Sequence, residues 1–133
     1  MLDHTADLRI RVSGSDPAAL FKNAGLALFD LIVEPDTLTT DETLEVQVHG
    51  EDPADLMVNY LRELLYLWTG GEKLVKMIHI LHISDTAVSA RVSTDRYQPQ
   101  CHDILHEIKA VTYHQIDVRM TADGWQALVV FDI

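Results

Sequence analysis

The sequence has little cysteine, with Cys101 alone among 133 residues. One thiol cannot form a disulfide within the chain or build a cysteine zinc cluster, which fits a reducing compartment. The chain also lacks an apolar run of the roughly 20 residues that a membrane helix needs, because Asp30 interrupts the longest candidate, residues 24–33. No basic segment followed by an apolar stretch opens the chain. We therefore expect a cytoplasmic protein with no membrane partner.

Basic residues are scarce as well. Ten Lys and Arg stand against 21 Asp and Glu, for a formal net charge of −11. Nucleic-acid affinity depends mainly on neutralising phosphates with Lys and Arg, so we expect no direct nucleic-acid binding. An acidic surface suits divalent cations or a basic protein surface, and it also favours solubility.

The length and composition indicate one globular domain. The chain has 133 residues, 47% of them hydrophobic and 23% charged, which are ordinary values for one soluble domain. We recognise no internal repeat, low-complexity segment or linker. We therefore expect a single domain over residues 1–133.

Apolar residues at helical spacing predict two amphipathic helices. One is expected from Asp16 to about Val33 and the other from Asp52 to about residue 70. Ser15 or Asp16 can cap the first helix and Asp52 begins the second, and in each case a proline that fits the first turn follows. Two helices are the whole helical content that the pattern supports.

Alternating apolar and polar residues predict strands elsewhere. Six segments have this pattern or a strand-like composition: residues 8–13, 44–49, 75–83, 87–92, about 108–120, and 125–131. The last four are expected to form two hairpins, separated by an irregular loop over 97–107. This order predicts an α+β domain, with a mostly antiparallel sheet of about six strands and the two helices packed on it.

Carboxylates stand near both ends of the chain, where the first predicted strand begins and the last one ends. Asp7 begins the first strand, whereas Asp132 and the α-carboxylate of Ile133 end the last. Hard divalent cations prefer such oxygen ligands, so these groups would form a metal site if the two strands were neighbours. The alternative is that Asp3 and Asp7 cap a turn and that the C-terminus is solvated. Composition and spacing leave both interpretations open.

Other candidate residues point less clearly to chemistry. His102 and His106 are four residues apart, but no glutamate lies between them as a zinc hydrolase motif requires, so a catalytic zinc site is not favoured. Alternation along the strand near residue 110 would place Lys109 and Tyr113 on one face and His114 on the other. A strand lysine is usually a solvated edge charge, although beside carboxylates it could bind a phosphate or a partner's acid.

Three segments together resemble the archease family. They are DHTAD at residues 3–7, IKAVTYH at 108–114, and the final segment 125–133, which begins WQA and ends FDI. The resemblance covers essentially the whole chain. It implies a small α+β protein that is not itself an enzyme and has no catalytic residues. Such a protein is a cofactor of the RtcB-type tRNA-splicing RNA ligase, promoting GTP-dependent guanylylation of the ligase and multiple turnover.

The resemblance also implies a set of site residues. It assigns a divalent metal ion, Ca²⁺, Mg²⁺ or Mn²⁺, to Asp7, Asp132 and Ile133, and a function-critical role to Lys109. His4 and His114 match further motif positions. GTP is involved only through the partner ligase.

Two other functions remain open from the sequence. One is a chaperone-like or acidic protein-binding module without a metal-dependent role. The other is a small metal-dependent hydrolase with His114 or His4 as base, although no nucleophile motif is present.

Overall fold

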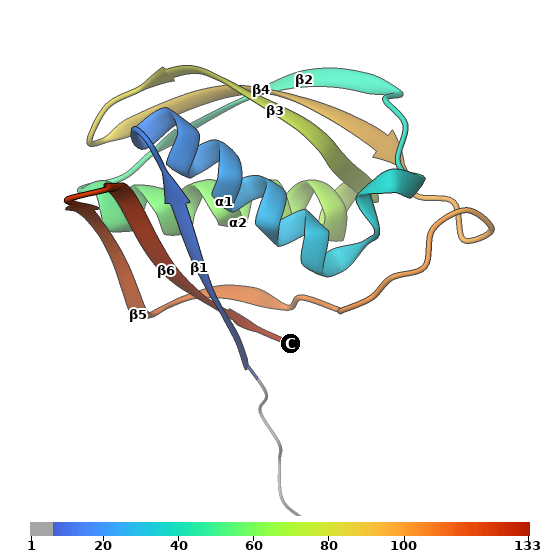
Figure 1. The fold of residues 1–133 in the computed structure, drawn as a ribbon. Helices are drawn as coiled ribbons and strands as arrows, with labels where there is room; N and C mark the ends of the chain where they lie inside the picture. The colour runs from blue at the N-terminus through green and yellow to red at the C-terminus, as the bar shows by residue number, and fades with distance from the viewer. Residues whose placement is uncertain (1–6) are drawn as a thin grey trace, which may run out of the picture.

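Two helices lie between two antiparallel sheets in the computed structural model, which describes residues 7–133 (Figure 1). The elements follow in the order β1 (Asp7–Gly14), α1 (Pro17–Ile32), a 3₁₀ turn (Pro35–Thr37), β2 (Glu42–His49), α2 (Pro53–Gly71), β3 (Lys73–Ile83), β4 (Ala87–Arg96), β5 (Ala110–Thr121) and β6 (Gly124–Asp132).

The predicted α+β class, the six antiparallel strands and the two helices are confirmed. The strands form two sheets instead of the one sheet expected from the sequence, with strand orders β1-β6-β5 and β2-β4-β3. Figure 1 shows one sheet on each side of the helix pair. The core fills the space between the sheets, since its largest fully buried side chains include Leu20, Leu28, Tyr60, Leu64 and Phe131. This burial on both sides explains why the helices have such wide apolar faces.

Both helices begin as predicted. The Asp16 side chain accepts a hydrogen bond from the Ala19 N–H at 2.7 Å, and the Asp52 side chain accepts one from the Asp55 N–H at 2.8 Å. A proline occupies the first turn of each helix, where its missing N–H costs nothing.

The expectation that the chain has no internal repeat is wrong. Residues 14–23, GSDPAALFKN, and residues 50–59, GEDPADLMVN, are identical at six of ten positions and each runs from the end of a strand through the cap into a helix. Asn23 and Asn59 each donate a side-chain N–H to the carbonyl ten residues earlier, at 2.8 and 2.9 Å. Each sheet likewise consists of one such strand and a hairpin. The fold is therefore a duplicated strand-helix unit completed by two hairpins.

The segment between β4 and β5 is irregular, as predicted, and a buried polar cluster anchors it. His102 Nε2 lies 3.2 Å from Asp95 Oδ2, which also accepts the Thr39 N–H at 3.0 Å. His102 Nδ1 accepts the Gln98 N–H at 3.0 Å. Because that ring nitrogen is an acceptor, the proton lies on Nε2 and is donated to Asp95.

The alternation predicted along β5 fails at its centre. Pairing with β6 is interrupted between Thr112 and Asp117, and Gln115 has a φ of 58° within this interruption. The extra residues form a bulge, which changes the faces to which the following side chains point. The strand also begins at Ala110, two residues later than expected.

Candidate metal and partner site

The first and last strands are neighbours, which brings the two acidic ends of the chain together. In the antiparallel register of β1 and β6, Asp7 lies directly opposite Asp132. Directly opposed residues have Cβ atoms about 4.5–5.5 Å apart and point to the same face of the sheet. Phe131, next to Asp132, is fully buried, so the two aspartates are on the outer face.

The start of β5 completes this end of the sheet. Ala110 pairs with Asp132 from the other side, and the Lys109 N–H donates to the Asp132 carbonyl at 2.8 Å. Lys109 therefore lies beside the last two residues of the chain. Its side chain is exposed and available for a ligand or a partner.

The charges at this end of the sheet favour a cation. Like charges directly opposite each other on a sheet are destabilising unless a positive charge neutralises them. Within residues 7–133, neither Asp7 nor Asp132 forms a salt bridge. The carboxylates are hard oxygen donors of the kind that Ca²⁺, Mg²⁺ and Mn²⁺ prefer.

The donor set is incomplete if side chains alone are counted. No group of three or more His, Cys, Asp or Glu side chains in the described part of the chain is arranged to hold a metal ion. A site here would combine two aspartates with the terminal carboxylate of Ile133, and water or partner atoms would supply the other ligands. That donor set fits a hard divalent cation.

His114, another predicted site residue, lies apart from Asp7 and Asp132. His114 is exposed in the β5 bulge, where its N–H donates to Thr112 Oγ1 at 3.1 Å. Ala110 pairs with Asp132 and Thr112 with Val130, so His114, which follows Thr112 along β5, lies farther from the strand end that carries Asp132. His4 and Asp3 lie outside the described residues.

A surface groove adjoins Lys109. Trp68 and Tyr97 line it, with their ring centroids 5.1 Å apart in an edge-to-face arrangement. Glu72 and Glu107 add two carboxylates to its walls. The lysine thus lies between an aromatic groove and the paired aspartates.

A cluster around Tyr113 links the bulge to α2, and the sequence analysis missed it. The Tyr113 hydroxyl donates to Asp55 Oδ1 at 2.8 Å and lies 3.1 Å from Asn59 Oδ1. The Arg62 guanidinium lies 4.6 Å from the centre of the Tyr113 ring, and Arg62 Nε donates to the Val111 carbonyl at 3.1 Å. The contacts span about half of the chain, so no local pattern predicts them. The one sequence feature that indicates this cluster is the four-residue spacing of Asp55 and Asn59, which places both side chains on one face of the helix.

These contacts also shift the ionisation of the cluster. The Glu51 N–H and the Tyr113 hydroxyl lower the pKa of Asp55 by bonding to its charged form. The same bond raises the pKa of Tyr113, because losing the proton would place two negative charges together. Tyr113 is therefore a neutral hydrogen-bond donor that holds the bulge against α2.

The structure does not bring His102 and His106 together on a helix. Both ring nitrogens of His102 are engaged inside the protein, whereas His106 is exposed in irregular backbone. None of the helices within residues 7–133 is long and apolar enough to cross a membrane.

Comparison with known proteins identifies the family. The model of the Archease protein family (MTH1598/TM1083) matches residues 1–133. Protein archease of Methanosarcina acetivorans is 36% identical, over 99% of this chain and 93% of the relative. Protein archease of Pyrococcus abyssi is 35% identical, over 98% of this chain and 95% of the relative. A protein archease-like of Drosophila melanogaster is 31% identical, over 99% of this chain and 88% of the relative.

The fold is also shared with a solved structure. The solution structure of Methanobacterium thermoautotrophicum protein 1598 has a TM-score of 0.79 and 24% sequence identity, covering 99% of this chain and 96% of that one. At this identity the likeness concerns the fold alone. The family model and the relatives agree along the full length, and the chain belongs to the archease family.

Proposed function

We propose that this protein is a metal-binding accessory protein that activates a tRNA-splicing RNA ligase of the RtcB type. It promotes GTP-dependent guanylylation of the ligase and multiple turnover, and has no catalytic residue of its own. The metal ligands are Asp7, Asp132 and the Ile133 carboxylate. Membership of the archease family supports the choice of partner.

The observation that carries the proposal is the register of β1 and β6. It sets Asp7 opposite Asp132 on the outer face of the sheet, at the edge where Lys109 joins β5. Two directly opposed carboxylates that form no salt bridge within residues 7–133 do not stabilise a sheet end by themselves. A site that holds a cation where a partner can reach it accounts for their placement.

The chain's residues have separate tasks in this function. Asp7 and Asp132 hold the cation through their carboxylates, and the backbone bond from Lys109 to Asp132 fixes the strand end that carries the second ligand. A divalent ion at this site supplies positive charge toward phosphate oxygens, which guanylyl transfer requires. The Lys109 ammonium can donate to a phosphate or to a carboxylate of the ligase. His114 and His4 are proposed to contact the partner.

A second candidate is a chaperone-like or acidic protein-binding module without a metal-dependent role. Two observations favour it: the described residues place only two acidic side chains at these strand ends, and the net charge is −11. Calorimetry distinguishes the two functions. Salt-sensitive binding of the ligase without any divalent-ion binding would favour this second candidate.

The test is a guanylylation assay of the RtcB-type ligase from the same organism, with GTP and with Mg²⁺ or Mn²⁺. We expect the wild-type protein to accelerate guanylylation, and Asp132→Ala and Lys109→Ala to abolish the acceleration while remaining folded. Asp103→Asn removes an exposed charge from the loop before β5 and is the matched control, which should remain active. Full stimulation by both variants would refute the assignment.

A further inference from the structure

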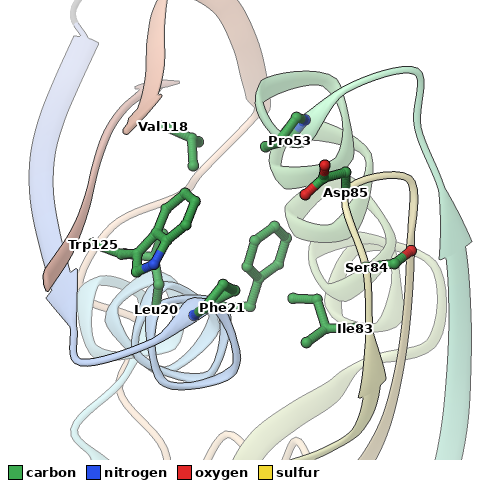
Figure 2. Close-up of a pocket in the computed structure, with 9 residues that line it drawn as sticks. Leu20, Phe21, Pro53, Ile83, Ser84, Asp85, Val118 and Trp125 are labelled. Carbon is green, nitrogen blue, oxygen red and sulfur yellow. The ribbon is translucent and has the colours of Figure 1, made fainter. Parts of the chain in front are cut away.

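A cavity lies where the starts of both helices meet the hairpin ends of both sheets (Figure 2). Its volume is about 170 Å³. Pro17 and Pro53, the first residues of α1 and α2, line it from equivalent positions of the duplicated unit. The β3–β4 hairpin contributes Asp85 and the β5–β6 hairpin contributes Trp125.

The walls of the cavity are apolar and aromatic. Phe21 and Leu20 form its buried floor, while Trp125, Val118 and Ile83 are partly exposed around it. Figure 2 shows the Phe21 ring projecting into the space from α1 and the Trp125 ring reaching it from β6. The volume is well below the roughly 300–1,000 Å³ of sites for drug-sized ligands. The cavity therefore fits one side chain rather than a nucleotide.

The charge at the cavity selects a cation. Among residues 7–133, Asp85 is the one charged residue that lines the space, and Figure 2 shows its carboxylate turned toward the cavity. The helix starts do not favour an anion, because Asp16 and Asp52 already accept hydrogen bonds from their first turns.

Asp85 is held in place by its turn. The Ser84 hydroxyl accepts the N–H groups of Thr86 and Ala87 at 3.3 and 3.1 Å, and the Ser84 N–H donates to the Ala87 carbonyl at 2.8 Å. Within residues 7–133, Asp85 itself forms no salt bridge. Its carboxylate is therefore both positioned and free to pair with an incoming cation.

We propose that this cavity receives an arginine side chain from a basic segment of a partner protein. The aliphatic stem would lie along the apolar walls, and the guanidinium would reach the aromatic rings and the Asp85 carboxylate. Arginine suits the site better than lysine, since its planar group stacks on aromatic faces and pairs with a carboxylate through two parallel hydrogen bonds. The net charge of −11 favours approach of a basic segment.

This site is separate from the proposed metal site and goes beyond the proposed function. Asp7 pairs with Asp132 at one end of β1, whereas Gly14 pairs with Trp125 at the other. Seven residue steps at roughly 3.4 Å each put the two ends about 24 Å apart. A partner could occupy both sites, but loss of one leaves the geometry of the other unchanged.

The test is an NMR titration of the ¹⁵N-labelled protein with a blocked peptide, Ac-Ala-Arg-Ala-NH₂. The two tryptophans give one indole N–H signal each, so Trp125 reports on the cavity and Trp68 serves as an internal control. We expect the Trp125 signal and the amide of Asp85 to shift until saturation with a millimolar Kd, because one side chain provides few contacts. The Trp68 signal should not move.

Two comparisons make the test specific. Asp85→Asn should weaken binding at least tenfold, whereas Asp103→Asn, with the same change of charge, should leave it unchanged. A peptide with citrulline in place of arginine keeps the shape but removes the charge, and it should not bind. The proposal is overturned if the shifts do not saturate, if citrulline binds equally well, or if Asp85→Asn has no effect.

Discussion

Replacing Asp7 with asparagine should stabilise the metal-free protein. Asp7 and Asp132 are directly opposed, and two like charges about 5 Å apart at the surface repel by roughly 0.8 kcal/mol in water. A domain of 133 residues has an unfolding entropy near 0.3 kcal/mol/K, so removing this repulsion should raise Tm by about 2–3 °C. The increase should shrink in high salt, because exposed charges are screened.

The same substitution should have the opposite effect once metal is added. A cation that binds only the folded protein stabilises it by about 2.7 kcal/mol at 100 times its Kd, which corresponds to roughly 10 °C. The wild-type protein should gain this stabilisation from Mg²⁺, Mn²⁺ or Ca²⁺, and Asp7→Asn should lose most of it. Thermal unfolding followed by circular dichroism, with and without EDTA, measures both effects, and Asp103→Asn is the control. An equal metal response in both proteins, or a less stable metal-free variant, would refute the reasoning.

Two further predictions concern the contacts that shape the site. Tyr113→Phe should lower Tm at pH 7 by a few degrees, because the charged form of Asp55 loses a hydrogen-bond donor. Folding lowers the pKa of Asp55, so the difference in Tm between the two proteins should fade as the pH falls below about 4. Melting curves recorded over a pH series measure this change. His102→Ala should destabilise the protein by about 3 kcal/mol, because it leaves the Asp95 carboxylate and a backbone N–H without their buried partner. Urea unfolding checks the second effect, with the exposed His106→Ala as a control that should change stability little.

Local patterns in the sequence predicted most of the elements. The Asp-Pro starts of α1 and α2 and the apolar stripes behind them produce caps and buried faces by short-range rules, and both helices begin where expected. The division into two sheets could not be predicted in this way. Alternation within a strand predicts which of its faces is buried, but it does not predict which other strand is its neighbour in the sheet.

The duplicated unit leaves a short trace in the sequence. The shared Gly-x-Asp-Pro start and the later asparagine recur at a shift of 36 residues, from 14 to 50. The match is short and the hairpins that complete each unit are not adjacent to it in the chain. In the structure, Asn23 and Asn59 are equivalent because the side-chain amide of each donates a hydrogen bond to a backbone carbonyl of the preceding strand.

The meeting of Asp7 and Asp132 was predicted conditionally, on the assumption that β1 and β6 are neighbours, and the register fulfils that condition. Local alternation does not predict the β5 bulge, within which Tyr113 bonds to Asp55 of α2 across a long sequence separation. As a result, simple alternation assigns the wrong surroundings to His114, which follows Tyr113 in the bulge.

The most direct test of the proposed metal site is isothermal titration calorimetry of divalent ions into the isolated protein at low ionic strength. The account predicts one ion bound per chain in the wild-type protein and in Asp103→Asn. It predicts no binding in Asp132→Asn, whose fold is verified in parallel by circular dichroism. Binding of equal strength in Asp132→Asn, or no binding by the wild-type protein to Mg²⁺, Mn²⁺ or Ca²⁺, would contradict the claim that the paired strand ends hold a metal ion.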